Sequence, residues 1–141
     1  MKGVVVDASV ALAWCFPDEA SNYADGVLVD LEGRAILVPA VWGLEIANAV
    51  LNGERSKRLR QPEIRRFTML LDNLSVVQDM QPVGEHVGNV LPLAREYNLS
   101  AYDAAYLELS IRHGVPLATL DGKLHKAAQR AGITIFAGRS V

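Results

Sequence analysis

Residues 3–9 read GVVVDAS, an uninterrupted apolar run that ends on an aspartate. Val4, Val5 and Val6 are β-branched and do not alternate with polar residues, which is typical of a strand covered on both faces in a parallel sheet. Asp7 follows at the point where such a strand ends. Its carboxylate can accept hydrogen bonds from the first amides of a following helix, or it can take part in chemistry.

Four further apolar runs resemble the first one. They are AILV at 35–38, LSVV at 74–77, PLATL at 116–120 and ITIF at 133–136. Helical patterns lie between them, at 18–31, 41–52, 62–72, 84–97, 101–113 and 122–131. Alternating strands and helices predict a three-layer α/β/α sandwich around a central, mostly parallel five-stranded sheet, built from right-handed βαβ units.

Length and composition predict one domain over residues 1–141, because the chain is long enough for a core and no linker divides it. The longest apolar runs are far below the ~20 residues that span a bilayer, and the N-terminus lacks a signal-peptide pattern. A single cysteine, Cys15, excludes an intrachain disulfide and suits a reducing cytoplasm. Cys/His clusters are absent from the sequence, which makes zinc an unexpected metal.

Four acidic residues occupy positions where acids are not expected: Asp7, Glu45, Asp103 and Asp121. Each has a structural explanation. Asp7 and Asp121 suit helix N-caps, Ser100 with Asp103 suits a capping box, and Glu45 suits a polar stripe on an apolar helix. Taken one at a time, these explanations are the simpler ones.

Taken together, the four acids point to a shared site, because ligands of open parallel sheets bind at the carboxyl ends of the strands. If the strands at 4–6 and 116–120 are neighbours, one rim gathers the acids. Clustered carboxylates need a counter-charge, and ligands that are all oxygen favour Mg²⁺, with Mn²⁺ as the alternative. The natural reaction is phosphodiester hydrolysis by metal-activated water. Thr119 can orient a water or an acid there, or can be a buried strand residue.

Six of the fourteen basic residues fall within a short stretch of the chain: Arg55, Lys57, Arg58, Arg60, Arg65 and Arg66. The net charge of −2 gives no indication of a nucleic-acid partner. The cluster is either a solvated surface or a patch that faces phosphates.

Four motifs, VVVDASV, LEIANAV, SAYDAAYLELS and LATLDGKLHKAAQRAGI, resemble in this order the PIN-domain family, and within it the VapC-type toxins of toxin–antitoxin pairs. The resemblance implies a magnesium-dependent endoribonuclease whose acidic positions fall on Asp7, Glu45, Asp103 and Asp121, with Thr119 as a hydroxyl before the last acid. We expect Asp7 and Asp103 to be direct metal ligands and Asp121 to lie beside them. Glu45 would assist or hold a second ion.

The resemblance also implies a homodimer and a small antitoxin whose C-terminal segment covers the acidic groove. The basic stretch 55–66 would contact RNA phosphates, and antitoxin acids as well. Three rivals stay open. A haloacid-dehalogenase-like phosphatase needs a second acid where Ser9 stands. A receiver domain would use Asp79 but leaves Glu45 and Asp103 unexplained. A catalytically silent PIN fold does not need all four acids.

Overall fold

The computed structural model describes residues 3–139, and its centre is a parallel sheet of four strands in the order β3-β2-β1-β4. The strands are β1 (Gly3–Val6), β2 (Ala35–Val38), β3 (Val76–Gln78) and β4 (Leu117–Ala118). The three valines of β1 are fully buried, since β1 is a central strand with helices on both faces. This confirms the parallel α/β sheet predicted from the apolar runs.

The fifth predicted strand, at 133–136, is reduced to one parallel bridge between Leu117 and Ile135. Two backbone hydrogen bonds surround it, from Leu117 N–H to Thr134 C=O at 3.0 Å and from Phe136 N–H to Leu117 C=O at 2.8 Å. Its neighbour β4 has only two residues, so it offers too short an edge for a further regular strand. The sheet therefore has four strands where the sequence predicted five.

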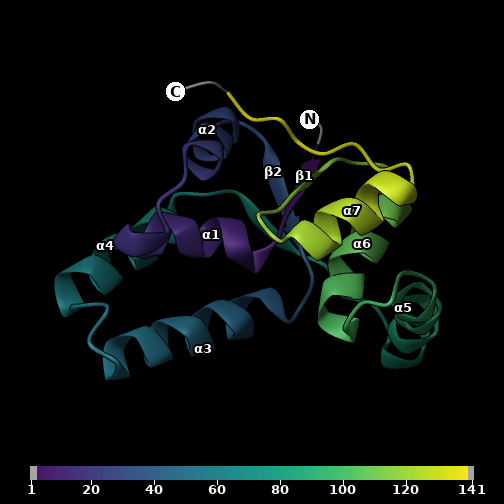
Figure 1. The fold of residues 1–141 in the computed structure, drawn as a ribbon, viewed down its shortest axis with the longest axis horizontal. Helices are drawn as coiled ribbons and strands as arrows, with labels where there is room; N and C mark the ends of the chain where they lie inside the picture. Colours follow the sequence, from purple (N-terminus) through teal and green to yellow (C-terminus); the bar gives the residue numbers. More distant parts are fainter. Residues whose placement is uncertain (1–2, 140–141) are drawn as a thin grey trace.

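Helices cover the sheet on both sides, as Figure 1 shows. One side carries α1 (Ala8–Cys15), α2 (Asn22–Asp30), α3 (Trp42–Arg55) and α4 (Gln61–Asp72), and the other carries α5 (Val83–Tyr97), α6 (Ala101–His113) and α7 (Gly122–Arg130). This division follows from right-handed crossovers, because the chain moves outward from β1 to β3 and then returns past β1 to β4. None of the helices among residues 3–139 is long and apolar enough to cross a membrane.

The helix predicted at 18–31 is divided in two. A single 3₁₀ turn, η1 (Pro17–Glu19), comes first, and α2 then begins after Ser21, whose hydroxyl oxygen accepts from the N–H of Ala24 at 3.2 Å. Proline at the first position of η1 and a serine cap four residues later are two separate start signals. The chain uses both.

The sheet order makes the boundary between β1 and β4 the switch point, because the connections from these two strands run in opposite directions. Val5 pairs with Leu117 and Val6 with Ala118. The ladder continues past both strands, since Asp7 N–H donates to Ala118 C=O at 3.1 Å. The next residues on the two chains are Asp7 and Thr119, which the register places side by side.

Helix α6 is the buried helix of the fold, with seven consecutive buried residues from Ala104 to Ser110. It packs on β1, β2 and β4 and is itself covered by α5 and α7. This explains why its sequence lacks a clean amphipathic pattern, since a helix enclosed on most sides needs no polar stripe. The acids and hydroxyls on α6 are therefore held in fixed positions relative to the sheet.

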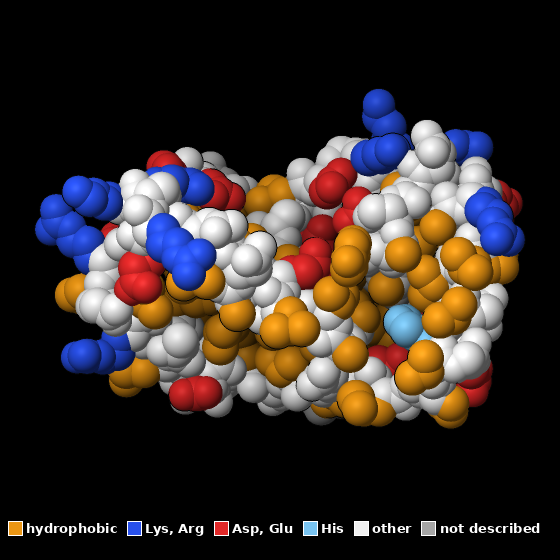
Figure 2. Space-filling model, turned by 90° about the horizontal axis from the view of Figure 1, so that it is seen from below, with side chains coloured by type: hydrophobic (Ala, Val, Ile, Leu, Met, Phe, Trp, Pro, Cys, Tyr) orange, Lys and Arg blue, Asp and Glu red, His pale blue; other side chains and the backbone are white. Residues whose placement is uncertain are grey.

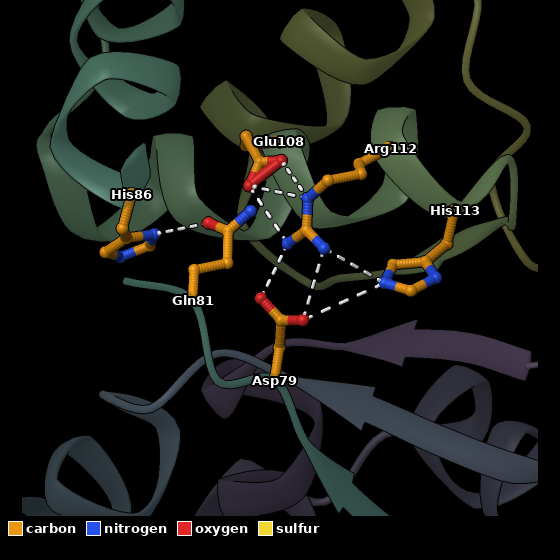
Figure 3. Close-up of polar contacts among 6 residues, drawn as sticks. All are labelled: Asp79, Gln81, His86, Glu108, Arg112 and His113. Atoms are coloured by element: carbon orange, nitrogen blue, oxygen red, sulfur yellow. Dashed lines mark hydrogen bonds and ion pairs between the residues drawn. The ribbon is translucent and has the colours of Figure 1, made fainter. Parts of the chain in front are cut away.

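An ion-pair network ties the C-terminal half of α6 to the end of β3 (Figure 3). The Arg112 guanidinium contacts Asp79 at 2.6 Å and Glu108 at 2.8 Å, and the His113 ring lies 3.8 Å from Asp79. Glu108 is almost fully buried, so Arg112 supplies the charge that a buried carboxylate needs. Asp79, the residue a receiver domain would phosphorylate, is thus part of a structural clamp.

Candidate functional site

Asp7 lies at the centre of the switch point, and its two carboxylate oxygens are both engaged. Oδ1 accepts from the Ser9 hydroxyl at 2.6 Å and from the Val10 N–H at 3.3 Å, while Oδ2 accepts from the Thr119 hydroxyl at 2.5 Å. The hydrogen bond from the Val10 N–H makes Asp7 the N-cap of α1, as predicted from the sequence. Asp7 is both a helix cap and a member of a polar cluster.

The environment of Asp7 favours its neutral form. Its side chain is only 4% exposed, and burial raises the pKa of this carboxyl to about 6, although the hydrogen bonds from Ser9, Thr119 and Val10 lower it and Asp103 adds a smaller rise. Burial penalises the charged form because the interior solvates it poorly. A cation at this rim would remove that penalty.

Two hydroxyls join the end of β1 to the loop before α7. Ser9 Oγ accepts from the Leu120 N–H at 2.9 Å, and Thr119 Oγ1 accepts from the Asp121 N–H at 3.0 Å. Each hydroxyl has one proton, and both donate it to Asp7. In this arrangement Ser9 and Thr119 orient the carboxylate of Asp7.

Asp103 is the acid that connects the other three. It stands in the first turn of α6, where its N–H donates to the Ser100 hydroxyl oxygen at 3.1 Å, the serine half of the predicted capping box. Burial raises the pKa of Asp103, with a further rise from Asp121, and Asp103 in turn contributes to the raised pKa of Asp7 and of Glu45. These mutual effects place Asp103 within electrostatic reach of all three.

Glu45 reaches the rim from the first turn of α3, and a tyrosine holds it there. The Tyr106 hydroxyl donates to Glu45 Oε1 at 2.5 Å. Burial raises the pKa of Glu45, and Asp103 adds to the rise, while the bond from Tyr106 opposes it. Tyr106 was not among the residues predicted from the sequence, although it lies three residues after Asp103 and hence on the same side of α6. That spacing was the available signal.

Asp121 is the N-cap of α7, again as predicted. Its Oδ1 accepts from the N–H groups of Lys123 at 2.8 Å and Leu124 at 3.3 Å. Both bonds go to one oxygen, so capping occupies half of the carboxylate. The structure thus brings all four acids and Thr119 to one rim, with Thr119 and Asp121 from the loop between β4 and α7 and the others from three separate segments.

The donor set fits a hard divalent cation with an open coordination sphere. It consists of carboxylate and hydroxyl oxygens, the ligands of Mg²⁺ and Mn²⁺. Within residues 3–139 no three Asp, Glu, His or Cys side chains are close enough together to enclose an ion. Mg²⁺ commonly keeps several waters and takes only one or two protein carboxylates, with substrate phosphate supplying further ligands.

Figure 2 shows the surroundings of the rim, with acidic side chains in a central hollow and Lys and Arg side chains towards both outer parts of the face. The six basic residues of the stretch 55–66 all belong to α3, α4 and the turn between them, and all six are exposed. Arg55 lies ten residues beyond Glu45 on the same helix, a rise of about 15 Å. Five of the six carry no ion pair to another residue within 3–139.

Arg58 is the exception. Its guanidinium contacts Asp18 at 2.9 Å and Glu19 at 2.7 Å, and it lies over the Phe16 ring at 4.3 Å. These contacts fasten the turn between α3 and α4 to η1. Arg58 therefore has a structural role in the free protein, and phosphate contact would have to compete with two carboxylates.

Comparison with known proteins gives consistent results. A family model described as PIN domain matches residues 4–130. Ribonuclease VapC3 of Pyrobaculum aerophilum is 29% identical over 121 residues, which cover 86% of this chain and 91% of that protein. The crystal structure of PAE2754 from Pyrobaculum aerophilum superposes with a TM-score of 0.65 at 26% identity, covering 89% of this chain and 79% of the other.

Two more distant structures share the fold alone. VapBC2 from Rickettsia felis, bound to a DNA fragment from its promoter, has a TM-score of 0.66 at 10% identity and covers 95% of this chain and 97% of the other. FitAcB from Neisseria gonorrhoeae has a TM-score of 0.60 at 15% identity and covers 94% and 96%. In both cases nearly the whole of each chain is matched.

Proposed function

The chain belongs to the PIN-domain family, and on this basis we propose that it is a VapC-like endoribonuclease, the toxin of a toxin–antitoxin pair, which hydrolyses RNA with Mg²⁺ or Mn²⁺. The observation that carries the proposal is the convergence of Asp7, Glu45, Asp103 and Asp121 at the β1/β4 switch point. Three of the four carboxyls have a raised pKa, as expected of acids gathered for a cation.

The proposed roles follow from the contacts of each side chain. Asp7 and Asp103 are direct ligands of the ion, Asp121 lies beside them with one oxygen uncommitted to its cap, and Glu45 assists or holds a second ion. A bound divalent ion would supply an activated water and neutralise the leaving oxygen. Thr119 positions the Asp7 carboxylate, and Tyr106 positions that of Glu45.

Phosphoryl-aspartate chemistry fits this geometry less well. The second acid of that chemistry is replaced by Ser9, and Asp79 is held by Arg112. A silent binding module is disfavoured because all four acids are present and brought together.

We also propose a cognate antitoxin and a homodimer as partners, and the cytoplasm as the location. An antitoxin segment that covers the acidic hollow would block access of RNA to the rim. Exposed apolar side chains support a protein interface, among them Leu44 at 73% exposure, Met80 at 78% and Val83 at 81%. Apolar side chains gather on either side of the hollow in Figure 2. Apolar side chains that gather on one exposed face commonly mark an interaction surface.

The decisive experiment compares cleavage of single-stranded RNA in Mg²⁺, in Mn²⁺ and in EDTA by the wild type and by Asp103→Asn. We expect cleavage with either ion, none in EDTA, and a loss of at least about 100-fold in the variant, because the shared acid is removed. Asp25→Asn, an exposed acid on α2, is the matched control and should cleave at the wild-type rate.

Thermal unfolding of both variants must accompany the assay, so that inactivity is not confused with loss of fold. Cleavage that persists in EDTA, or Asp103→Asn as active as Asp25→Asn, would refute the metal-dependent mechanism.

A further inference from the structure

We propose that the hollow beside Asp121, between α7 and Tyr23, is a subsite for the RNA nucleotide next to the cleaved phosphodiester, with Lys126 contacting its phosphate. This rests on the proposed function. The hollow has a volume of about 540 Å³, within the range of small-molecule sites. Thr119 and Asp121 form part of its wall and part of the acidic rim, so the two sites are continuous.

The lining of the hollow suits a nucleotide. Tyr23, Leu120 and Ile135 give it apolar surface, against which a base can stack. The Tyr23 hydroxyl donates to Phe136 C=O at 2.6 Å, which fixes the ring in place. At the α7 side, His125 and Gln129 present groups that can hydrogen-bond a base edge or a ribose hydroxyl.

In the part of the chain that the structure describes, the charge of α7 is free to contact a ligand, as it is for five of the six basic residues of the stretch 55–66. The helix contains no acid, and Lys123 and Lys126 are exposed and make no ion pair to any other residue within 3–139. Lys123 is near enough to Asp103 to lower the pKa of that acid. Arg58 and Arg112, by contrast, are already paired with carboxylates. An unpaired lysine beside a cluster of acids is suited to a phosphate that approaches them.

The two basic surfaces lie on opposite sides of the rim. The α3–α4 hairpin carries the stretch 55–66 on one side, and α7 carries Lys123 and Lys126 on the other, as the positions of these helices in Figure 1 show. An RNA chain bound across the acids would therefore contact lysine or arginine side chains on both sides of the cleaved phosphodiester bond. The α7 hollow is the side that also offers a stacking surface.

Binding can be tested without catalysis. A fluorescent single-stranded 12-nucleotide RNA of mixed sequence is titrated in EDTA at several salt concentrations with wild type, Lys126→Met and Arg95→Met. Arg95 is an exposed residue of α5 outside the hollow, so its variant controls for the loss of one positive charge. We expect Lys126→Met to weaken binding about 3- to 10-fold and to reduce the salt slope by about one. Arg95→Met should match the wild type.

Kinetics and crosslinking locate the contact. Lys126→Met should raise KM with kcat kept within about twofold, as for a group that binds substrate and transition state equally. RNA carrying 4-thiouridine, irradiated on the wild type in EDTA, should crosslink to Tyr23 or His125. RNA that binds equally well to Lys126→Met, or that crosslinks only within residues 42–72, overturns the subsite and leaves the nuclease proposal standing. Absence of both RNA binding and cleavage overturns the two together.

Discussion

Asp7→Asn should stabilise the metal-free protein at neutral pH. The pKa of Asp7 rises from 3.8 to about 6 on folding, mainly through burial. Since one pKa unit equals about 1.4 kcal/mol, ionised Asp7 costs the folded state about 3 kcal/mol above pH 6. Asparagine is nearly isosteric and keeps the Oδ1 acceptor, but Thr119 then faces an amide and must reorient its hydroxyl. We set that loss at about 1 kcal/mol, which leaves a net gain of about 2 kcal/mol at pH 7.

The sign of the pH dependence follows from the direction of the shift. A raised carboxyl pKa means that the folded state holds the proton more tightly, so wild-type stability is greatest at low pH and falls as pH rises from 3.8 to about 6. Asparagine has no such dependence. The variant should be less stable than the wild type by about 1 kcal/mol below pH 4 and more stable above pH 6. The two should cross at about pH 4.5.

The assay is urea unfolding in EDTA at pH 4, 5, 6 and 7.5, with equal m-values required so that the free energies can be compared. Asp103 and Glu45 also have raised pKa values, but they are present in both proteins, so the difference reports mainly on Asp7. Asp25→Asn serves as the exposed-acid control. A difference between wild type and Asp7→Asn that stays constant with pH would refute the raised pKa of Asp7 in the folded protein.

Three further outcomes can be measured. Tyr106→Phe removes the hydroxyl that holds Glu45 but keeps the buried ring, so kcat should fall about 10-fold. In a double-mutant cycle of cleavage rates, adding Glu45→Gln to this variant should cause little further loss. Gly53→Ala should lower the free energy of unfolding by about 1–3 kcal/mol, because the added Cβ would lie 2.6 Å from a ring carbon of Phe16. In the same helix, the Cβ added by Gly43→Ala meets nothing within 4 Å, so this variant should be more stable by up to about 1 kcal/mol. Arg112→Met should lower the free energy of unfolding by about 1–3 kcal/mol, measured in urea, because it leaves the buried Glu108 carboxylate without its ion-pair partner. The cleavage rate should change little.

The sheet could be predicted from the sequence because its strands are short, apolar and β-branched. The run at 133–136 shows the limit of this reasoning. Its composition is as strand-like as that of 35–38, but a strand also needs a partner edge, and β4 offers only two residues. Strand propensity is a property of the segment alone. Strand pairing also depends on the length of the neighbouring strand, which the sequence of the segment does not encode.

The proximity of Asp7 and Thr119 could be predicted because parallel pairing brings strand ends to one edge, and the register then places these two residues side by side. The hydrogen-bond partners of the four acids could not be predicted in this way. The bond between Tyr106 and Glu45 joins residues 61 positions apart, and that between Ser9 and Leu120 joins residues 111 apart. The pairing of Arg58 with Asp18, 40 positions away, could not be predicted either. The basic stretch 55–66 therefore includes one residue that stabilises the fold.

The capping and metal-binding explanations of the acids are compatible, and together they explain how the fold tolerates the cluster. Asp7 and Asp121 cap α1 and α7, and Glu45 and Asp103 stand in the first turns of α3 and α6. Each acid therefore lies at the positive end of a helix dipole, where a negative charge is favoured by roughly 0.3–1 kcal/mol. Four such helix ends around one rim offset part of the mutual repulsion, so the chain can fold before any ion arrives. The raised pKa values are the part of the repulsion and burial that the helices do not offset, and this remainder is what a divalent cation would relieve on binding.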